Sequence, residues 1–292
     1  MKIISKLAAV VAVAILATSM AACGSQAQTT GTKSLIKEIK ERGELRIGVA
    51  SAQPWSWEDP ATGEWQGVYI DIMRDWAENT LDVKFTTVST SWENMVAGLN
   101  AGQFDVATAL NHRPARALAV TFSKEVMTQI SAFTFYPDKT PITTWAELND
   151  PKYTLCVMQG SSQELSLSNY GPKAEVLRLA DQDACRLALT AGTANAHMDD
   201  WAGSGPDAEA NPGLKVVFPD APMAVGGIAY AINAGYSYDD IQALNIQIDD
   251  YSNRGLLTAS VRKWGAVDPV LYSVEPIPQY VIDLEKKQYP AE

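Results

Sequence analysis

The sequence is poor in residues that commonly hold metal ions. Its 292 residues include only two histidines and three cysteines. No short Cys/His spacing occurs, which argues against a zinc site, and nothing in the sequence predicts a cofactor. His112 and His197 are single histidines, and Ser161-Ser162 lacks a partner that could activate a hydroxyl. The sequence therefore predicts neither a metal centre nor the active site of an enzyme.

Positive charge is also scarce. The chain carries 23 Lys and Arg residues against 34 Asp and Glu residues, a formal charge of -11. Removing an N-terminal segment that contains Lys2 and Lys6 leaves a charge of -13. An acidic chain of this kind argues against nucleic acid as a partner and against electrostatic adhesion to anionic lipid.

Long apolar runs are absent after the N-terminus. Residues 1–22 combine a basic start with an apolar stretch too short for a stable transmembrane span, which is typical of a signal peptide. The stretch Ser19–Cys23 resembles a bacterial lipobox, although Met20 stands where leucine is preferred. We therefore expect cleavage before Cys23, lipid modification of its thiol, and a flexible tether over residues 23–34. The alternative is an ordinary signal peptide followed by an incidental cysteine.

Beyond the tether, Cys156 and Cys185 are the two cysteines that remain. An even pair in an exported protein favours a disulfide between them. Two free, buried thiols are the alternative.

Apolar periodicity alternates between strand-like and helix-like segments, in two similar sets. The first set has strands at 45–50, 83–88 and 104–110 and helices at 67–77 and 92–101. The second set has strands at 153–158, 175–179 and 194–198 and helices at 162–169 and 183–190. Strands that alternate with helices indicate crossover connections and a mainly parallel sheet. The pattern predicts an α/β protein with two lobes.

Two further strand-like segments, 130–136 and 227–233, are predicted to carry the chain between the lobes. The predicted boundaries are 35–134 and 229–292 for lobe 1 and 135–228 for lobe 2. A long helix at 238–254 belongs to lobe 1, and the tail after Gly265, with a short amphipathic segment at 280–287, is expected to pack against one lobe.

A series of short motifs occurs in a fixed order along these segments. They are Gly43–Gly48, Gly67–Ile72, Trp92–Gly102, Asp105-Val106, Arg116 followed by Phe122-Ser123, Gly160–Ser162, Gly192–Asp200, Leu244-Asn245, Asp249, Gly255-Leu256 and Lys263-Trp264. No single motif is specific, but the ordered set resembles the bacterial extracellular solute-binding proteins of the polar-amino-acid class, family 3. The resemblance implies a two-lobed periplasmic-binding-protein-like fold of type II, with two hinge strands.

The resemblance also implies a site for an amino-acid-like ligand. Arg116 matches the position that binds the ligand carboxylate, which a guanidinium can grip with two charge-assisted hydrogen bonds. A surface arginine is the alternative reading of this residue. Thr108, Ala109 and Asn111 match the positions that offer a hydroxyl and backbone N–H groups after the third strand.

The second lobe is expected to supply the remaining polar contacts. Ser161 and Ser162 match a donor turn at a helix start, where unpaired N–H groups favour an anion. Ser162 could instead be a plain N-cap, and both roles can coexist. Asp200 matches the aspartate that binds the ligand ammonium, and it is preferred over its neighbour Asp199 because successive side chains of a strand point to opposite faces.

Aromatic side chains are expected to sandwich the ligand. Trp55 and Trp92 match the family positions for this role, with Trp57 as a third candidate wall. Filling of the core is the alternative reading of each tryptophan.

Two departures from the family pattern bear on the ligand. Arg113 stands where the family usually has threonine, and the acidic residues of basic-amino-acid binders are absent at Ala50–Ala52. Basic ligands are therefore disfavoured, while polar, apolar or acidic ones stay open. If Arg113 faces the cleft, it favours an acidic ligand or a second carboxylate group.

The resemblance implies a monomeric binding protein, not an enzyme, that delivers its ligand to an ABC permease. Lipid anchoring would hold it at the outer face of the cytoplasmic membrane or in the periplasm. Two alternatives have the same fold: a ligand-sensing extracellular module, and an exported dehydratase acting on cyclic amino-acid precursors.

Overall fold

The computed structural model describes residues 33–219, 225–265, 279–280 and 283. The predicted signal peptide, Cys23 and most of the tether lie outside the described residues, as does most of the tail after Gly265. Of the tether, Lys33 forms a bridge with Tyr236 and the hydroxyl of Ser34 donates to Asp240 at 2.9 Å. The packed chain therefore includes these two residues.

Twelve strands are assigned within the described residues. They are β1 (Glu44–Val49), β2 (Trp57–Glu58), β3 (Trp65–Gln66), β4 (Lys84–Ser89), β5 (Val106–Asn111), β6 (Val120–Phe122), β7 (Met127–Phe135), β8 (Thr154–Met158), β9 (Glu175–Leu179), β10 (Ala196–Asp200), β11 (Lys215–Val217) and β12 (Val225–Asn233). Ten of them form one sheet with the order β4-β1-β5-β12-β7-β10-β8-β9, in which β6 pairs with β12 and β11 pairs with β7. β2 and β3 form a separate hairpin.

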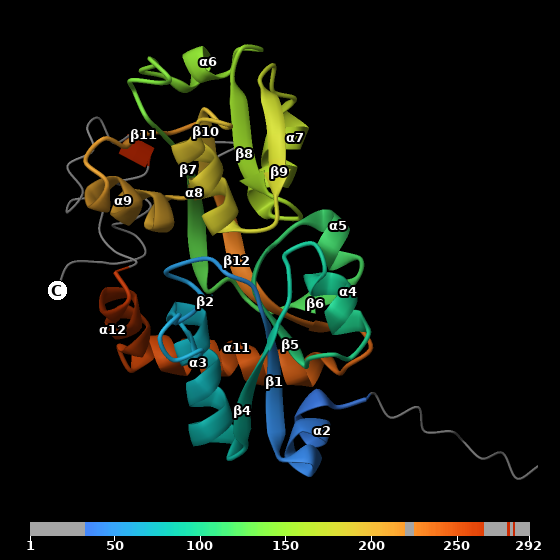
Figure 1. The fold of residues 1–292 in the computed structure, drawn as a ribbon. Coiled ribbons are helices and arrows are strands. Elements are labelled where there is room, and N and C mark those ends of the chain that lie inside the picture. Colours follow the sequence, from blue (N-terminus) through green and yellow to red (C-terminus); the bar gives the residue numbers. More distant parts are fainter. Residues whose placement is uncertain (1–32, 220–224, 266–278, 281–282, 284–292) are drawn as a thin grey trace, which may run out of the picture. The chain divides into compact units, whose positions relative to one another are not determined.

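The sheet consists of two parallel sets joined by antiparallel strands. β1 is parallel to β4 and β5, and β8 is parallel to β9 and β10. Between these sets, β12 pairs antiparallel with β5 and β7, and β7 pairs antiparallel with β10. Figure 1 shows β7 and β12 running between the two sets. This arrangement confirms the predicted α/β class.

The helices within the described residues follow the strands along the chain. They are α2 (Leu35–Arg42), α3 (Val68–Asp75), its π-helical continuation η1 (Trp76–Leu81), α4 (Met95–Asn100), α5 (Pro114–Ala117), α6 (Trp145–Leu148), α7 (Ser162–Tyr170), α8 (Gln182–Ala191), α9 (Trp201–Ala210), α11 (Tyr238–Asn253) and α12 (Leu256–Lys263). None of the described helices combines the length and apolarity that a membrane crossing requires.

Sequence periodicity does not reveal α2, α9 or α12. The α9 segment contains Gly-Ser-Gly-Pro at 203–206, a composition that disfavours a helix. Its first turn is nevertheless capped, because the Asp200 carboxylate accepts the N–H of Ala202 at 2.8 Å. Gly255 ends α11 in the left-handed region, with φ +73°, and at the same time precedes α12.

Each parallel set has its own buried core. The larger core gathers apolar side chains from β1, β5, β12 and the helices around them, with Ile47, Met73 and Leu244 completely buried. A second core contains Phe133 stacked on Trp145 at 4.8 Å, together with side chains of β8 and β10. The apolar side chains therefore pack as two separate cores, one in each parallel set.

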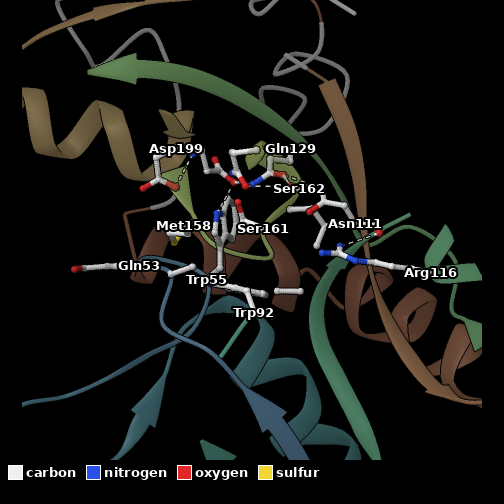
Figure 2. Close-up of a pocket in the computed structure, with 15 residues that line it drawn as sticks. Gln53, Trp55, Trp92, Asn111, Arg116, Gln129, Met158, Ser161, Ser162 and Asp199 are labelled. Atoms are coloured by element: carbon white, nitrogen blue, oxygen red, sulfur yellow. Dashed lines mark hydrogen bonds between the residues drawn. The ribbon is translucent and has the colours of Figure 1, made fainter. Parts of the chain in front are cut away.

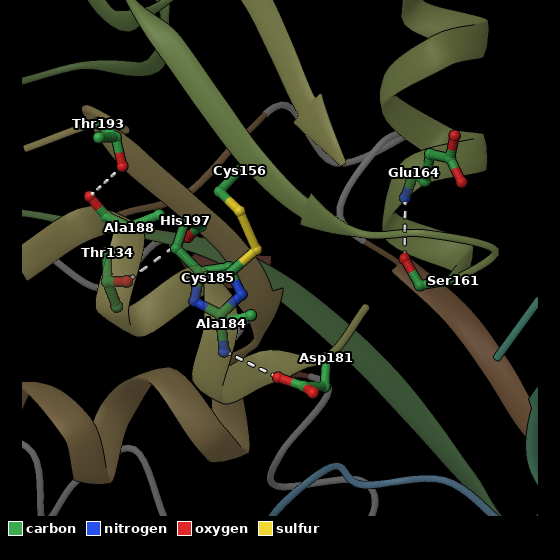
Figure 3. Close-up of a disulfide and its surroundings, with 10 residues drawn as sticks. All are labelled: Thr134, Cys156, Ser161, Glu164, Asp181, Ala184, Cys185, Ala188, Thr193 and His197. Carbon is green, nitrogen blue, oxygen red and sulfur yellow. Dashed lines mark hydrogen bonds between the residues drawn. A yellow bond between two sulfur atoms is a disulfide. The ribbon is translucent and has the colours of Figure 1, made fainter. Parts of the chain in front are cut away.

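The disulfide lies within the second set. Cys156 of β8 and Cys185 of α8 form a disulfide, as the even pair of cysteines predicts. Both residues are fully buried. Figure 3 shows the bond between the strand and the helix. It fixes α8, whose first turn is capped by Asp181, against the face of the sheet.

Candidate functional site

A pocket lies where the two parallel sets meet. Its empty volume is about 430 Å³, including open solvent at the mouth. The lining residues are Ala52, Gln53, Trp55, Trp92, Ala109, Asn111, Arg116, Gln129, Met158, Ser161, Ser162, Gln163, Asp199, Asp200 and Ile228. Figure 2 shows Gln129, Ser162 and Trp55 converging on one part of the pocket and Arg116 with Asn111 at another.

The structure brings together all but one of the predicted ligand-binding residues. The exception is Thr108, which does not line the pocket and is fully buried. Its hydroxyl donates to the carbonyl of Gly48 at 2.9 Å, so it joins β5 to β1 instead of facing the cleft. Trp57 is also absent from the lining, because its ring packs edge-on against Trp264 at 5.1 Å.

The Asp200 carboxylate forms one end of the site. It ends β10, and its Oδ2 accepts the indole N–H of Trp55 at 2.8 Å and the amide of Gln129 at 3.0 Å. Burial, followed by the charge of Asp199, raises the pKa of Asp200 to about 7. A ligand ammonium would favour the ionised form of this carboxyl.

Asp199 also lines the pocket, contrary to the simple alternation of strand side chains. Its Oδ1 accepts the N–H of Asp200 at 2.8 Å, and its Oδ2 accepts the side-chain amide of Gln182. Burial raises the pKa of Asp199 to about 6. Both oxygens of Asp199 thus have partners within the chain, as do both oxygens of Asp200.

A half-buried ion pair lies near Asp199. Arg186 of α8 pairs with Asp207 of α9 at 2.6 Å, and its charge also acts on Asp199 and His197. Burial, and then Arg186, lower the pKa of His197 to about 3, so this imidazole is neutral. His197 does not line the pocket, and within the described residues its Nε2 has no hydrogen-bond partner.

Arg116 forms the other end of the site. α5 begins with Pro114 at its first position, a placement that suits the fixed φ of proline, and presents Arg116 two residues later. The guanidinium donates to the carbonyl of Gly160 at 2.8 Å and to that of Asn111 at 3.3 Å. Burial, and then the charge of Arg113, lower the pKa of Arg116 to about 10, which still leaves it protonated at neutral pH.

The turn before α7 also lines the pocket. Here Ser161 is the N-cap, because its hydroxyl oxygen accepts the N–H of Glu164 at 3.1 Å. Ser162 is the first helical residue, so the reading of Ser162 as a plain N-cap is wrong. Its hydroxyl instead donates to the side-chain carbonyl of Gln129 at 3.0 Å, inside the pocket.

Two tryptophans line the pocket, as predicted. Trp55 lies in the turn after β1, and Trp92 lies in the turn that precedes α4. Trp92 is only 9% exposed, and its indole N–H has no hydrogen-bond partner within the described residues. An indole N–H can only donate, so this group is suited to an acceptor on a ligand.

Gln129 is a pocket residue that sequence reasoning missed. It lies on β7, is 8% exposed, and donates to Asp200 while its carbonyl accepts from Asn111 at 2.7 Å and from Ser162. A glutamine within a strand of β-branched and aromatic residues was the available signal, because a buried amide requires polar partners. Gln53, Met158, Gln163 and Ile228 carry no comparable signal in the sequence.

Ala109 has a backbone conformation that is rare for alanine. Its φ is +53°, and the register between β5 and β12 shifts at the same place, opposite Ala229 and Ala231. Such an irregularity turns the strand and redirects the groups that follow it. The irregularity lies within β5, two residues before Asn111, which lines the pocket.

Comparison with known proteins identifies the family. Residues 45–267 match the bacterial extracellular solute-binding proteins, family 3, and the chain belongs to this family. It is 24% identical over 255 residues to cyclohexadienyl dehydratase of Pseudomonas aeruginosa, covering 84% of this chain and 90% of that protein. It is also 26% identical over 162 residues to the L-cystine-binding protein TcyA of Bacillus subtilis, covering 53% and 57% of the two chains.

Solved structures confirm the type II periplasmic-binding-protein fold. The L-cysteine solute receptor of Neisseria gonorrhoeae is 26% identical, with a TM-score of 0.71 over 80% of this chain and 97% of that one. An ancestral amino acid-binding protein, a precursor of cyclohexadienyl dehydratase, is 25% identical with the same TM-score, over 79% and 99% of the two chains. Relatives of this chain thus include both binding proteins and an enzyme.

Proposed function

We propose that this chain is the solute-binding component of an ABC importer and captures a small amino acid. The observation that carries this proposal is the placement of Arg116 and Asp200 at different ends of one pocket, on opposite parallel sets. A free amino acid has a carboxylate and an ammonium a few ångströms apart, and these two side chains complement them. The membership of family 3 and the binding proteins among the relatives support the same function.

Capture would proceed by closure of two lobes, residues 35–134 with 229–292 and residues 135–228, about β7 and β12. Contacts already cross between the proposed lobes: Trp55 donates to Asp200, Arg116 donates to the carbonyl of Gly160, and the N–H of Gln53 donates to Gln182 at 3.2 Å. A ligand held from both sides would stabilise this closed arrangement relative to an open one.

The cellular role extends this proposal. We infer a monomer, exported and held through a lipid on Cys23, that presents its ligand to an ABC permease. Labelling of the protein with a radioactive or clickable fatty acid in its host would test the anchor, with Cys23→Ala as control. An unlabelled parent protein would contradict it.

One observation favours a second candidate function, an exported dehydratase. Asp200 is a buried acid with a pKa of about 7, within the range that suits proton transfer at neutral pH. The dehydratase relative is similar over 84% of this chain.

One experiment separates the two functions. Purified full-length protein is titrated calorimetrically with the common amino acids and, separately, incubated with cyclohexadienyl acids. Saturable, stoichiometric binding with unchanged ligand is expected. Turnover of a cyclohexadienyl acid that Asp200→Asn abolishes would instead show the enzyme, and absence of any amino-acid binding would contradict the importer role.

A further inference from the structure

The strongest unassigned feature of the site is a pair of arginines that no carboxylate of the described chain balances. Arg113 and Arg116 flank the start of α5 and reach the α7 region of the other parallel set. Arg113 donates to the hydroxyl of Ser166 at 2.5 Å and lies 3.4 Å from the carbonyl of Ser162. All acceptors of both guanidinium groups are neutral.

Other arginines of the chain are placed differently. Arg46, Arg186 and Arg254 have ion pairs with aspartates at 2.8, 2.6 and 2.6 Å. Within the described residues, neither Arg113 nor Arg116 has a carboxylate within 4.0 Å. In a chain of formal charge -11, an unbalanced pair of cations beside a pocket calls for a specific explanation.

Arg113 lies directly behind the pocket wall. A Cβ atom on Gly226 would be 3.3 Å from the side-chain nitrogen of Asn111, which lines the pocket, and 3.9 Å from Nη2 of Arg113. Nδ2 of Asn111 and Nη2 of Arg113 therefore both lie beside Gly226. Because Asn111 lines the pocket and Arg113 is partly buried beside it, the charge of Arg113 is expected to act on whatever occupies the pocket.

Hydrogen-bond donors are also in excess. The indole N–H of Trp92 and the Nε–H of Arg113 are both buried without an acceptor in the described part of the chain. The donors of Asn111 and Ser162, by contrast, are directed to the carbonyl of Gln129. Trp92 lines the pocket, so a ligand that brings an additional acceptor would satisfy its indole N–H, and leaving this donor unpaired is costly.

We propose that the site selects amino acids with a second acidic group, a selectivity that rests on the proposed binding function. The α-carboxylate of a zwitterion would balance Arg116 and its ammonium would balance Asp200, which leaves the charge of Arg113 unbalanced. A side-chain carboxylate supplies the missing negative charge together with an acceptor for the indole N–H of Trp92. A side-chain amide supplies acceptors alone, and a basic side chain supplies neither.

The test uses pairs of ligands that differ only in this group. Purified full-length protein is titrated with L-aspartate against L-asparagine and with L-glutamate against L-glutamine. At least one acid is expected to bind about tenfold or more tightly than its amide, the effect of one charge-assisted hydrogen bond. Amides that bind as tightly as the acids, or more tightly, would overturn the selectivity.

Variants separate recognition of charge from a structural role. Arg113→Gln is expected to reduce the preference for acid over amide by about tenfold and to leave the affinity for the amide within about threefold. Arg74→Gln, which removes a charge from an exposed surface pair with Glu78, is the matched control and should change neither. Equal losses for acid and amide in Arg113→Gln would show that Arg113 only holds the two parallel sets together, which overturns the proposal.

Failure of the underlying function has a different signature. If no amino acid of the panel binds at all, the proposed importer role fails and this selectivity fails with it. If amino acids bind but without preference for acids, only the selectivity fails.

Discussion

The indole N–H of Trp55 donates to the carboxylate of Asp200 at 2.8 Å, across the junction of the two parallel sets. Trp55 follows β1, whereas Asp200 ends β10, so the bond joins side chains that are 145 residues apart in the chain. The same carboxylate oxygen accepts from Gln129 on β7. Asp200 is therefore oriented by groups from the turn after β1 and from β7 before any ligand arrives, and this orientation has consequences that can be measured.

Removing the Trp55 donor while keeping an aromatic ring is expected to weaken ligand binding. A hydrogen bond to a charged group contributes about 1.5–3 kcal/mol, so Trp55→Phe should lower the affinity by roughly tenfold to hundredfold. Isothermal titration calorimetry gives the dissociation constants. Trp57→Phe is the control, because Trp57 packs on Trp264 outside the pocket. Equal affinities of Trp55→Phe and the parent would contradict a role for this bond.

Stability of the unliganded protein should fall as the pH rises through neutrality. Burial raises the pKa of Asp199 to about 6 and that of Asp200 to about 7, from 3.8 for an ordinary aspartate. The folded protein thus holds protons that the unfolded chain has released, and this contribution is complete below about pH 4 and lost as the pH passes 6 and 7. Thermal unfolding should show a lower Tm at about pH 8 than at about pH 6, with a smaller difference in Asp200→Asn. A parent protein whose Tm does not fall between about pH 6 and about pH 8 would contradict this prediction.

Ligand binding should have the opposite dependence on pH. In the proposed site, the ammonium of an amino acid would pair with the ionised carboxylate of Asp200, so affinity should increase as the pH rises from about 6 to 8. Calorimetry in buffers with different enthalpies of ionisation should detect protons released on binding near pH 6.5. Asp200→Asn should bind weakly at every pH and release no such protons. Binding that is independent of pH and releases no protons would place the ammonium elsewhere.

Much of the architecture could be predicted from the sequence, because apolar periodicity reflects which faces are buried. The alternating residues around Ile47 and those of 153–158 predict strands that the structure contains. The helix α9 could not be predicted, since its stability comes from the Asp200 cap and from packing of Trp201, which override the Gly-Ser-Gly-Pro composition.

The candidate site could be predicted in part, because some of its residues match a motif by their side-chain chemistry. Arg116, Asp200 and the two tryptophans carry side-chain chemistry that matches a motif, and they do lie in one pocket. Thr108 carries the same kind of signal, yet its hydroxyl donates to the carbonyl of Gly48 on the neighbouring strand β1. Whether a polar group faces a pocket or a neighbouring strand depends on backbone geometry that residue type does not determine.

Loss of the disulfide should reduce stability more than function. Cys156 and Cys185 are 29 residues apart, and closing a loop of this length corresponds to about 3–4 kcal/mol in the chain-entropy model. The double variant Cys156→Ala/Cys185→Ala should therefore unfold at a clearly lower denaturant concentration. Its ligand affinity should change by no more than about threefold, since neither cysteine lines the pocket. Chemical reduction of the parent should give the same shift, and an unchanged unfolding midpoint in both would contradict the stabilising role.

Closure about β7 and β12 should depend on a glycine where the two parallel sets touch. Gly160 has φ +75°, and a Cβ there would lie 2.5 Å from the backbone of Glu93 in the loop before α4. Gly160→Ala should therefore obstruct the closed arrangement as well as strain the turn, and ligand affinity should fall by tenfold or more.

Gly171 provides the matched control for this substitution. Its φ of +68° is nearly the same, but a Cβ there would meet nothing within 4 Å. Both alanine variants should lose about 1 kcal/mol of unfolding free energy from the strained conformation, because alanine tolerates positive φ poorly. Gly160→Ala alone should lose affinity and keep a larger radius of gyration, measured by small-angle X-ray scattering at saturating ligand. If the two variants bind equally well, contact at Gly160 does not limit ligand binding, and the prediction fails.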